Sequence, residues 1–409
     1  DPRIPGKWNR RGLVMGNVQS GKTQNYLGLI NKAMDCGYRI IILLGGGNSN
    51  DLRKQTQSRV DEGIIGRKSR HLIQPGEGIN PQIGVGKYRN PDYSVATLTS
   101  TENDFKRQVA KQLGISLKDL NAPIIFTIKK NTTIMNNLCE WIKDFHDLEP
   151  LEDRRLDLPL LLIDDEADYA TPNSRKDYEK VTRTNELIRQ TLNLFNKSTY
   201  IGYTATPFAN IFIHPESFDE ALGDDLYPED FMIKVPPPEN YLGQNFYFEN
   251  QNLEEIGPIE IIDDNELMLP MTGQKPHTPV GPIAPSLKEA IRAFVISCSI
   301  RDARGQNKDH KSMIVNITHL NALQGQITNE IDNYLKELKQ AIHHIDGQTY
   351  NECSHNATVQ ELLKTFNTDF NVPEDFDLVL KHVNKAANKI KLFGVNTETK
   401  VEVDYSIYP

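Results

Sequence analysis

The sequence lacks any long apolar stretch. Its longest apolar segments, Arg39 to Leu44 and Leu158 to Ile163, have the length of a buried strand and fall well short of the ~18–20 residues that a membrane-spanning helix needs. The beginning of the chain is polar and contains proline, which is not the pattern of a signal peptide. We therefore expect no membrane association. Because the chain starts with Asp1 instead of methionine, we also expect it to be an excised fragment.

Cysteine is also scarce. The four cysteines are scattered and include no CxxC pair: Cys36, Cys139, Cys298 and Cys353. This spacing suggests neither a zinc site nor a disulfide framework. We therefore expect a protein of the reducing cytoplasm.

Positive charge is not in excess either. Lysine and arginine number 46, against 55 aspartates and glutamates, which gives a formal net charge of −9. This balance excludes a histone-like protein and a binder that relies on a basic tail. If the protein binds nucleic acid, the binding must be local, in a groove and not over a broad basic surface.

What the sequence does contain, over its first ~210 residues, is an alternation of strand-like and helix-like segments. Short apolar segments end near Gly16, Leu44, Ile128, Ile163 and Gly202, and helix-like or turn-forming residues follow them. This alternation predicts an α/β fold with a mostly parallel sheet.

The chain changes character after this region, and its length favours two domains. Residues His214 to Pro285 are rich in proline, aromatic residues and acids, as in an insertion or linker. Ser286 and Glu289 predict a capping box for a helix through Ala303. Further helices are predicted at 320–342, 359–366 and 377–390, and strands at 312–318, 391–395 and 401–405. The predicted domains are 1–215, a linker at 216–285, and an incomplete second domain at 286–409.

A phosphate-binding loop is the most specific motif. Residues 16–23, GNVQSGKT, match GxxxxGK[ST], with a predicted strand before them and a predicted helix after them. In such a loop, glycines let backbone N–H groups surround phosphate oxygens at a helix N-terminus. Lys22 would contact the β- and γ-phosphates of ATP, and Thr23 would ligate magnesium. The predicted nucleotide-binding residues are Trp8, Gly16, Gln19, Ser20, Gly21, Lys22 and Thr23.

Two parts of this prediction have plainer alternatives. The loop could be a glycine-rich turn with an exposed lysine, although the strand–loop–helix context favours a phosphate loop. Trp8, just upstream, is assigned to stack on the adenine, but a core tryptophan fits the sequence about equally well.

A cluster of carboxylates ends the apolar segment near Ile163. Four acids lie within five residues, and like charges so close raise one another's pKa, which favours a bound divalent cation. In a nucleotide site, Asp165 would hold magnesium through water, and Glu166 would orient and activate the attacking water. The predicted catalytic residues are Lys22, Asp165 and Glu166. The alternative is a solvated acidic turn.

Several motifs resemble those of superfamily-two helicases. Asp165-Glu166-Ala167-Asp168 has the sequence of their DEAD box, and Thr204-Ala205-Thr206 resembles their SAT-like motif, which couples the ATP site to nucleic-acid movement. Leu52 to Thr56 resembles the LxxQ helix of motif Ia, and Phe126 to Lys130 resembles a later motif near bound nucleic acid. The resemblance implies a RecA-like P-loop ATPase with a partial second RecA-like domain. Its coupling residues would be Asp168, Thr204 and Thr206.

A narrower resemblance runs through most of the chain. The strings GLVMGNVQSGKT, LLIDDEADYA, YIGYTATPFANIFI and DLYPEDF resemble the endonuclease Z-one domain family, most specifically from Gly12 to Ile213. That family is similar to the motor subunits of restriction systems and occurs in bacterial defence operons. The resemblance implies a helicase-like motor ATPase that acts on DNA with other subunits of such an operon. Helicase motifs five and six, with an arginine finger, are expected beyond Pro409.

Four residues are candidates for contact with the DNA backbone. Gln55 and Arg59 follow the second predicted strand, and Lys129 and Lys130 follow the strand that ends at Ile128. These segments should leave the same sheet edge as the nucleotide loops, and amide or cationic side chains suit phosphate oxygens. The alternative for each is an ordinary solvated surface residue.

Nuclease chemistry is much less evident. Glu398-Thr399-Lys400 fits part of a restriction-type metal site, but such triplets recur by chance in a chain this charged. Cys353 with His355, and His343 with His344, have the wrong number and spacing for a closed zinc site. An ATPase-gated endonuclease and a nucleotide-sensing scaffold therefore stay as alternatives to a motor.

Overall fold

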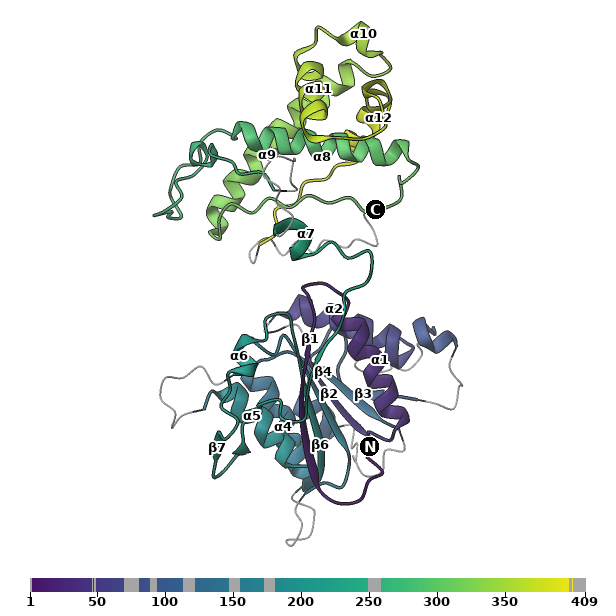
Figure 1. The fold of residues 1–409 in the computed structure, drawn as a ribbon, viewed down its shortest axis with the longest axis vertical. Coiled ribbons are helices and arrows are strands. Elements are labelled where there is room, and N and C mark those ends of the chain that lie inside the picture. The colour runs from purple at the N-terminus through teal and green to yellow at the C-terminus, as the bar shows by residue number, and fades with distance from the viewer. Residues whose placement is uncertain are drawn as a thin grey trace. The chain divides into compact units, whose positions relative to one another are not determined.

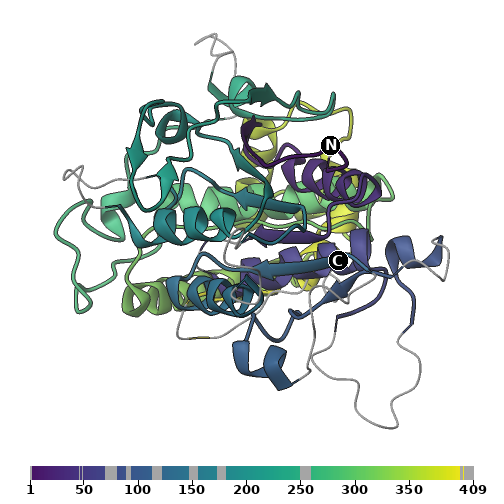
Figure 2. The same cartoon turned by 90° about the horizontal axis from the view of Figure 1, so that it is seen from below.

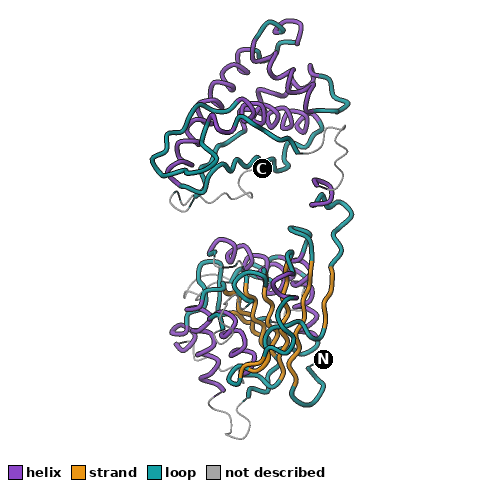
Figure 3. Tube along the Cα trace, turned by 60° about the vertical axis from the view of Figure 1, so that its left-hand side comes forward, coloured by secondary structure: helices purple, strands orange, loops and turns teal. Residues whose placement is uncertain are grey.

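The computed structural model describes residues 2–45, 47, 49–69, 81–88, 94–112, 122–146, 155–172, 181–248, 259–396 and 399. The chain divides into two compact units, Asp1–Gly243 and Gln244–Pro409. Each is described by itself. The strands of the described residues all lie in the first unit, as the colours of Figure 3 show.

A seven-stranded sheet forms the centre of the first unit, in the order β3-β4-β2-β5-β6-β1-β9, and all its pairings are parallel (Figure 1). The strands are β1 (Trp8–Met15), β2 (Ile40–Leu44), β3 (Ala96–Thr97), β4 (Ile124–Ile128), β5 (Leu160–Asp165), β6 (Lys197–Thr204) and β9 (Phe231–Lys234). The central strands β2 and β4 are buried at every position, as expected for a parallel sheet that is covered on both faces. The predicted α/β fold is confirmed.

Helices cover both faces of this sheet. The longer ones are α1 (Lys22–Asp35), α2 (Asn50–Val60), α4 (Thr132–His146) and α5 (Arg183–Asn193), and the short ones are α3 (Arg107–Gln112) and α6 (Phe208–Ile211). Tyr26 and Ile30 of α1, which is purple in Figure 2, pack with Ile41 and Ile163 on one face. Alternate residues of the same strands pack with α4 and α5 on the other face, so two cores enclose the sheet.

The order of strands decides where the motifs meet. Strand β6, which ends at Thr204, lies between β1 and β5. The phosphate loop after β1 and the acidic turn after β5 therefore flank the end of β6. This is the arrangement of RecA-like ATPases, and it places all three motifs at the carboxyl edge, where open α/β sheets bind their ligands.

The first unit extends beyond its predicted end at residue 215. Strand β9 pairs with β1, and the bare Cα of Gly12 makes room for Phe231, whose ring would lie 2.1 Å from a Cβ at that position. A small hairpin, β7 (Phe218–Asp219) and β8 (Gly223–Asp224), precedes β9. Residues 216–243 are thus part of this unit and not of a linker. Sequence alone misread them because proline and acid enrichment also suits short edge elements.

The second unit is built from helices in its described residues. They are α7 (Gln244–Phe248), α8 (Pro285–Ala303), α9 (Asn321–His344), α10 (Tyr350–Cys353), α11 (Ala357–Asp369) and α12 (Phe376–Lys389). One stripe of α9 is buried, at Leu323, Ile327, Ile331, Leu335, Leu338 and Ile342, which is the spacing of a helix face that meets a core. The predicted long helices are confirmed, and none of the described helices is both long and apolar enough to cross a membrane.

Three predictions for this unit are wrong. Residues 312–318 and 391–395 are not strands. In the first segment Met313, Val315 and Ile317 pack on the helical core, so burial of one face explains the alternation without a neighbouring strand. The helix α8 starts at Pro285 with Ala284 as N-cap, and Asp264, not a capping box, accepts hydrogen bonds from Ser286.

A RecA-like domain needs a sheet. The described residues of the second unit supply none, so they give no support to a second RecA-like domain. The predicted strand at 401–405 lies outside the described residues.

Candidate nucleotide site

The loop between β1 and α1 is folded back on itself. The backbone N–H of Gly16 donates to the carbonyl of Thr204 at 3.1 Å, which ties the loop to the end of β6. Gln19 and Gly21 have φ values of 55° and 95°, in the left-handed region. Ser20 is buried, and its Oγ donates to the Asn17 carbonyl at 2.8 Å. A left-handed residue other than glycine is costly and is typical of functional loops.

Lys22 lies over this loop and faces the acids. Its Nζ donates to the carbonyls of Gly16 and Asn17, at 3.0 and 2.8 Å. Burial lowers the pKa of Lys22, while the carboxylates of Asp165, Asp168 and Glu166 act in the opposite direction. The predicted lysine therefore lies within the electrostatic influence of the predicted carboxylates, while its ammonium is bonded to its own loop.

Asp165 is a half-buried carboxylate of the site. Burial raises its pKa, Glu166 and Asp164 raise it further, and a hydrogen bond from the hydroxyl of Tyr26, at 3.2 Å, opposes them. Tyr26 lies on α1, the helix that also carries Thr23, so it joins the helix of one predicted magnesium ligand to the other ligand, Asp165. Sequence analysis missed Tyr26, which lies one turn after Thr23 on the same face of α1.

This donor set fits magnesium bound with a nucleotide. No group of three or more His, Cys, Asp or Glu side chains suited to a metal occurs among the described residues. Magnesium is usually held by one or two carboxylates together with substrate phosphates and water. One half-buried, incompletely neutralised carboxylate together with a threonine hydroxyl matches that pattern.

Glu166 stands at a strained position. Its φ is 56°, and its backbone N–H donates to the Asp165 carboxylate at 3.1 Å. The side chain is exposed, and one carboxylate oxygen would lie 3.5 Å from a Cβ at Gly47. The turn therefore holds a free carboxylate over the loop that follows β2.

Asp168 joins the acidic turn to the end of β6. It accepts hydrogen bonds from the hydroxyls of Thr204 and Thr206, at 2.5 and 2.6 Å. Burial favours the neutral acid, but these two hydrogen bonds outweigh it and lower the pKa of Asp168. The three predicted coupling residues are in direct contact, while their role in coupling stays a prediction.

Lys130 is not on a nucleic-acid surface, and that prediction is wrong. Its ammonium is fully buried and lies 2.7 Å from the buried carboxylate of Asp164. It also donates to the carbonyls of Glu166 and Tyr169. Thr171 and Tyr200 donate to the same aspartate, at 2.7 and 2.9 Å. The pair holds the acidic turn in place. The available signal was the apolar strand that runs directly into Asp164.

Trp8 cannot stack on a nucleotide held by the loop. It begins β1, which is eight residues long, whereas the loop follows the other end of that strand. At ~3.3 Å per residue, the two ends are roughly 23 Å apart. Trp8 instead packs edge-to-face with Tyr38, with ring centroids 6.3 Å apart.

The other predicted nucleic-acid residues lie near the carboxyl edge. Gln55 is exposed on α2, and the half-buried Lys129 donates from its Nζ to Asn50 of the same helix at 2.8 Å. Arg59 is different, because its Nη1 donates to the hydroxyl of Thr23 at 3.1 Å. Arg59 therefore differs from Gln55 and Lys129, because it contacts a predicted nucleotide-binding residue.

Two further residues at this edge were not found from the sequence. Arg53 is buried in α2 and donates to the carbonyls of Ser100 and Thr101, which fixes the loop after β3. The hydroxyl of Tyr241 donates to the carbonyl of Val18 in the phosphate loop at 2.5 Å. Arg53 lies within the segment that resembles motif Ia but is not one of that motif's signature positions, and Tyr241 belongs to no recognisable motif.

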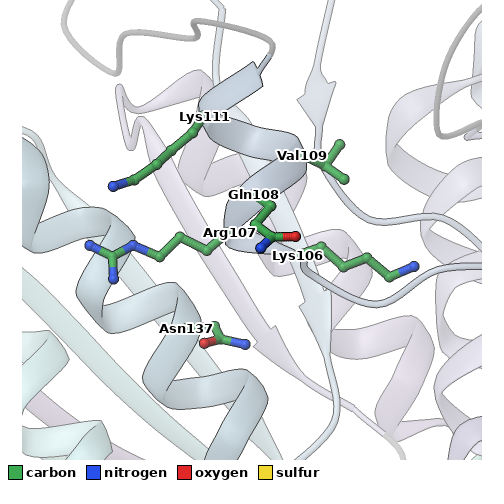
Figure 4. A pocket seen from close by; sticks show the side chains of 6 residues that line it. All are labelled: Lys106, Arg107, Gln108, Val109, Lys111 and Asn137. Carbon is green, nitrogen blue, oxygen red and sulfur yellow. The ribbon is translucent and has the colours of Figure 1, made fainter.

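A cavity of about 470 Å³ lies beside α3 and α4 (Figure 4). In this view Arg107 and Lys111 extend to one side and Lys106 to the other, so the three cations do not converge. Arg107 and Lys111 bind Asp144, at 2.7 and 3.1 Å. Four strands separate β3, which precedes α3, from β1. The cavity is therefore distinct from the nucleotide site.

The candidate nuclease residues do not form a site in the described part of the chain. Glu398 and Lys400 lie outside the described residues. Cys353 is buried, and its Sγ contacts the Thr349 carbonyl at 3.1 Å. His343 and His344 are exposed in the last turn of α9.

Residues 286–408 match the Z1 domain family. The match covers the second unit, whereas the sequence resemblance to the same family was most specific at 12–213. The crystal structure of the Pyrococcus furiosus Hef helicase domain is similar, with 13% identity and a TM-score of 0.31 over 93% of this chain. This chain spans 65% of that one. No curated protein matches the chain. The assignment of the first unit as RecA-like therefore depends on its own strand order.

Proposed function

We propose that this chain is the ATP-binding part of a helicase-like motor ATPase that acts on DNA. The observation that carries the proposal is that the phosphate loop and the acidic turn both bond to the end of β6, at Thr204. A phosphate loop, a magnesium carboxylate and a third motif in contact with both are what nucleotide hydrolysis requires.

Each group at the edge has a chemical task in this proposal. Backbone N–H groups of residues 17–22 and the N-terminus of α1 would bind phosphate oxygens. Lys22 leaves the loop carbonyls for the terminal phosphates, a stronger acceptor. Thr23 and Asp165 hold magnesium, which neutralises charge on the phosphates when bound. Glu166 accepts a proton from the attacking water, and its strained backbone fixes the position of its carboxylate.

DNA is proposed to cross the carboxyl edge beside α2. Gln55 and Lys129 are accessible there and suit backbone phosphates, which carry no sequence information. The contact of Asp168 with Thr204 and Thr206 offers a path by which hydrolysis could move that edge. A cytoplasmic role in DNA restriction or phage defence, with other subunits of such a system, is part of the proposal and follows from the sequence resemblance described above.

ATP hydrolysis by the full-length protein, measured with and without DNA, tests the proposal. We expect DNA to stimulate hydrolysis, Lys22→Ala to abolish nucleotide binding, and Glu166→Gln to retain ATP without turnover. Lys364→Ala, at an exposed position of the second unit, is the matched control and should behave as wild type.

Two other outcomes would assign a different function. Magnesium-dependent nicking of DNA that survives Lys22→Ala would indicate a nuclease. Nucleotide binding that DNA does not stimulate would indicate a nucleotide-sensing scaffold. Unchanged ATP affinity in Lys22→Ala would show that the site itself is misplaced.

A further inference from the structure

Helix α2 presents two polar side chains one turn apart. Gln55 and Arg59 are both exposed and are spaced i, i+4, which places them on the same face of the helix. Arg59 lies in the last turn of α2, and its Nη1 is 3.1 Å from the Thr23 hydroxyl in the first turn of α1. The helix therefore reaches the first turn of α1 at its C-terminal end, while Gln55 lies one turn earlier, at its middle.

The partner of Arg59 is a weak one for a guanidinium. A hydroxyl is neutral, whereas arginine binds phosphate through shorter, charge-assisted hydrogen bonds that are roughly twice as strong as neutral ones. No carboxylate in the described part of the chain forms an ion pair with Arg59. Its charge is thus available to an anion that arrives beside Thr23.

Such an anion is expected from the proposed function, on which the present inference rests. A nucleotide bound at this loop would place a phosphate oxygen beside the Thr23 hydroxyl, because that hydroxyl and the phosphate would hold magnesium together. The guanidinium is already within hydrogen-bond distance of the hydroxyl. A rotation of its side chain would bring it to the phosphate.

We infer that Arg59 is a nucleotide-binding residue, which contacts a terminal phosphate of a nucleoside triphosphate beside Thr23, and that it does not contact DNA. This reassigns a residue that the sequence placed on the nucleic-acid surface. It also gives α2 a nucleotide contact in its last turn and a DNA-facing amide one turn earlier.

Buried hydrogen bonds hold helix α2 rigid, so that a displacement of Arg59 would also displace Gln55. Gln57 is fully buried, donates to Asp61 at 2.9 Å and accepts from Thr99 at 2.9 Å. Asp61 in turn accepts from the backbone and hydroxyl of Ser69. A pull on Arg59 by the terminal phosphate would therefore move the helix as a body.

The test compares two affinities in one set of variants of the full-length protein. Magnesium-ATP, magnesium-ADP and inorganic triphosphate are titrated against wild type, Arg59→Ala and Arg59→Lys. Arg59→Ala should weaken ATP and triphosphate binding about tenfold, the loss expected for a hydrogen bond to a charged group, and weaken ADP binding less. Arg59→Lys keeps the charge without the planar fork and should fall between.

DNA binding by the same variants supplies the second readout. The log–log slope of DNA affinity against salt should be unchanged in Arg59→Ala, because no phosphate contact is lost. Lys54→Ala, on the same helix and paired with Asp51, is the matched control and should leave ATP affinity unchanged. Melting temperatures of all variants should match wild type, since the Arg59 side chain is exposed.

Unchanged ATP affinity in Arg59→Ala would overturn the inference, and a salt slope shallower by about one would return Arg59 to the DNA surface. Failure of the proposed function looks different. In that case Lys22→Ala would leave ATP affinity unchanged, or wild type would not bind ATP at all.

Discussion

Asp165 in the first unit is half-buried and Asp302 in the second is buried, and their surroundings shift the pKa values of the two carboxyls in opposite directions. Burial and the neighbouring acids raise the pKa of Asp165. Burial acts in the same direction on Asp302, but hydrogen bonds from Lys311 and Lys389 outweigh it and lower the pKa of that carboxyl. The first unit thus keeps an incompletely neutralised negative charge at the edge of its sheet. In the second unit, Lys311 and Lys389 neutralise the Asp302 carboxylate. These ion pairs join α8 to the segment that carries Lys311 and to α12.

The largest expected effect concerns Asp164, the buried carboxylate of the first unit that Lys130 neutralises. Lys130→Ala would leave Asp164 buried without its cation, and breaking a buried pair costs about 3–5 kcal/mol. The free energy of unfolding of the first unit, from denaturant titration, measures this loss. Lys129→Ala is the control and should change it by less than about 0.5 kcal/mol. If Lys130→Ala proved equally mild and weakened DNA binding, its surface assignment would be restored.

Asp302→Asn should destabilise the second unit by about 1–3 kcal/mol at neutral pH, because hydrogen bonds between charged groups are lost. The folded pKa of Asp302 is lowered. Its contribution is therefore present above the unfolded value, ~3.9, and is lost as pH falls through the folded value. Unfolding of wild type and variant from pH 7 to pH 2 should show the difference disappearing in acid. A constant difference over that range would contradict the assignment.

Asp165→Asn should have the opposite sign and a smaller size. The folded pKa of Asp165 is raised, so wild type carries a penalty that develops as pH rises above the unfolded value, ~3.9, and is complete once pH exceeds the folded value. Removing the charge should stabilise the first unit by about 1 kcal/mol, at the expense of function. Thermal melting measures the gain, and magnesium with ATP should raise the melting temperature of wild type only. Destabilisation by Asp165→Asn would refute the contrast with Asp302.

The smallest effect is expected at the link between the acidic turn and β6. Thr206→Ala removes one of the two hydroxyl donors to Asp168, and because Thr206 is exposed the loss should be below about 1 kcal/mol. The pKa of Asp168 should rise toward its ordinary range, so the difference in stability is present at neutral pH and is lost as pH falls through the folded pKa. Thr206→Ser should restore wild-type behaviour. An unchanged pKa of Asp168, followed by NMR, would show that the contact is not formed.

The site could be predicted largely because its members are neighbours in the chain. GNVQSGKT and DDEAD each lie at the end of an apolar strand, and the carboxyl ends of parallel strands meet at one edge. The prediction that Trp8 stacks on the adenine was wrong for the same geometric reason, since Trp8 lies at the opposite end of β1 from the phosphate loop. The prediction that Lys130 contacts DNA was wrong because the sequence around a strand end does not show whether a cation there points outward or toward a buried acid.

Contacts between distant segments were the least accessible to sequence analysis. The pairing of β9 with β1 joins residues more than two hundred positions apart, and only the fit of Phe231 over Gly12 explains it. Residues 312–318 alternate like a strand, yet the alternation records one face packed on helices. Apolar residues at every second position show which face of a segment is buried, but they do not show whether a partner strand exists.

The position of β1 between β6 and β9 also matters for how the protein is made. Both neighbours of β1 come late, from residues 197–204 and 231–234, whereas β1 itself is residues 8–15. At a synthesis rate of ~5–20 residues per second, this apolar strand waits roughly 10–40 s on the ribosome before its first neighbour exists. During that time the strand that will carry the phosphate loop has two unsatisfied edges. We therefore expect nascent chains that stall before residue 197 to need chaperones, and truncations that end before β9 to aggregate.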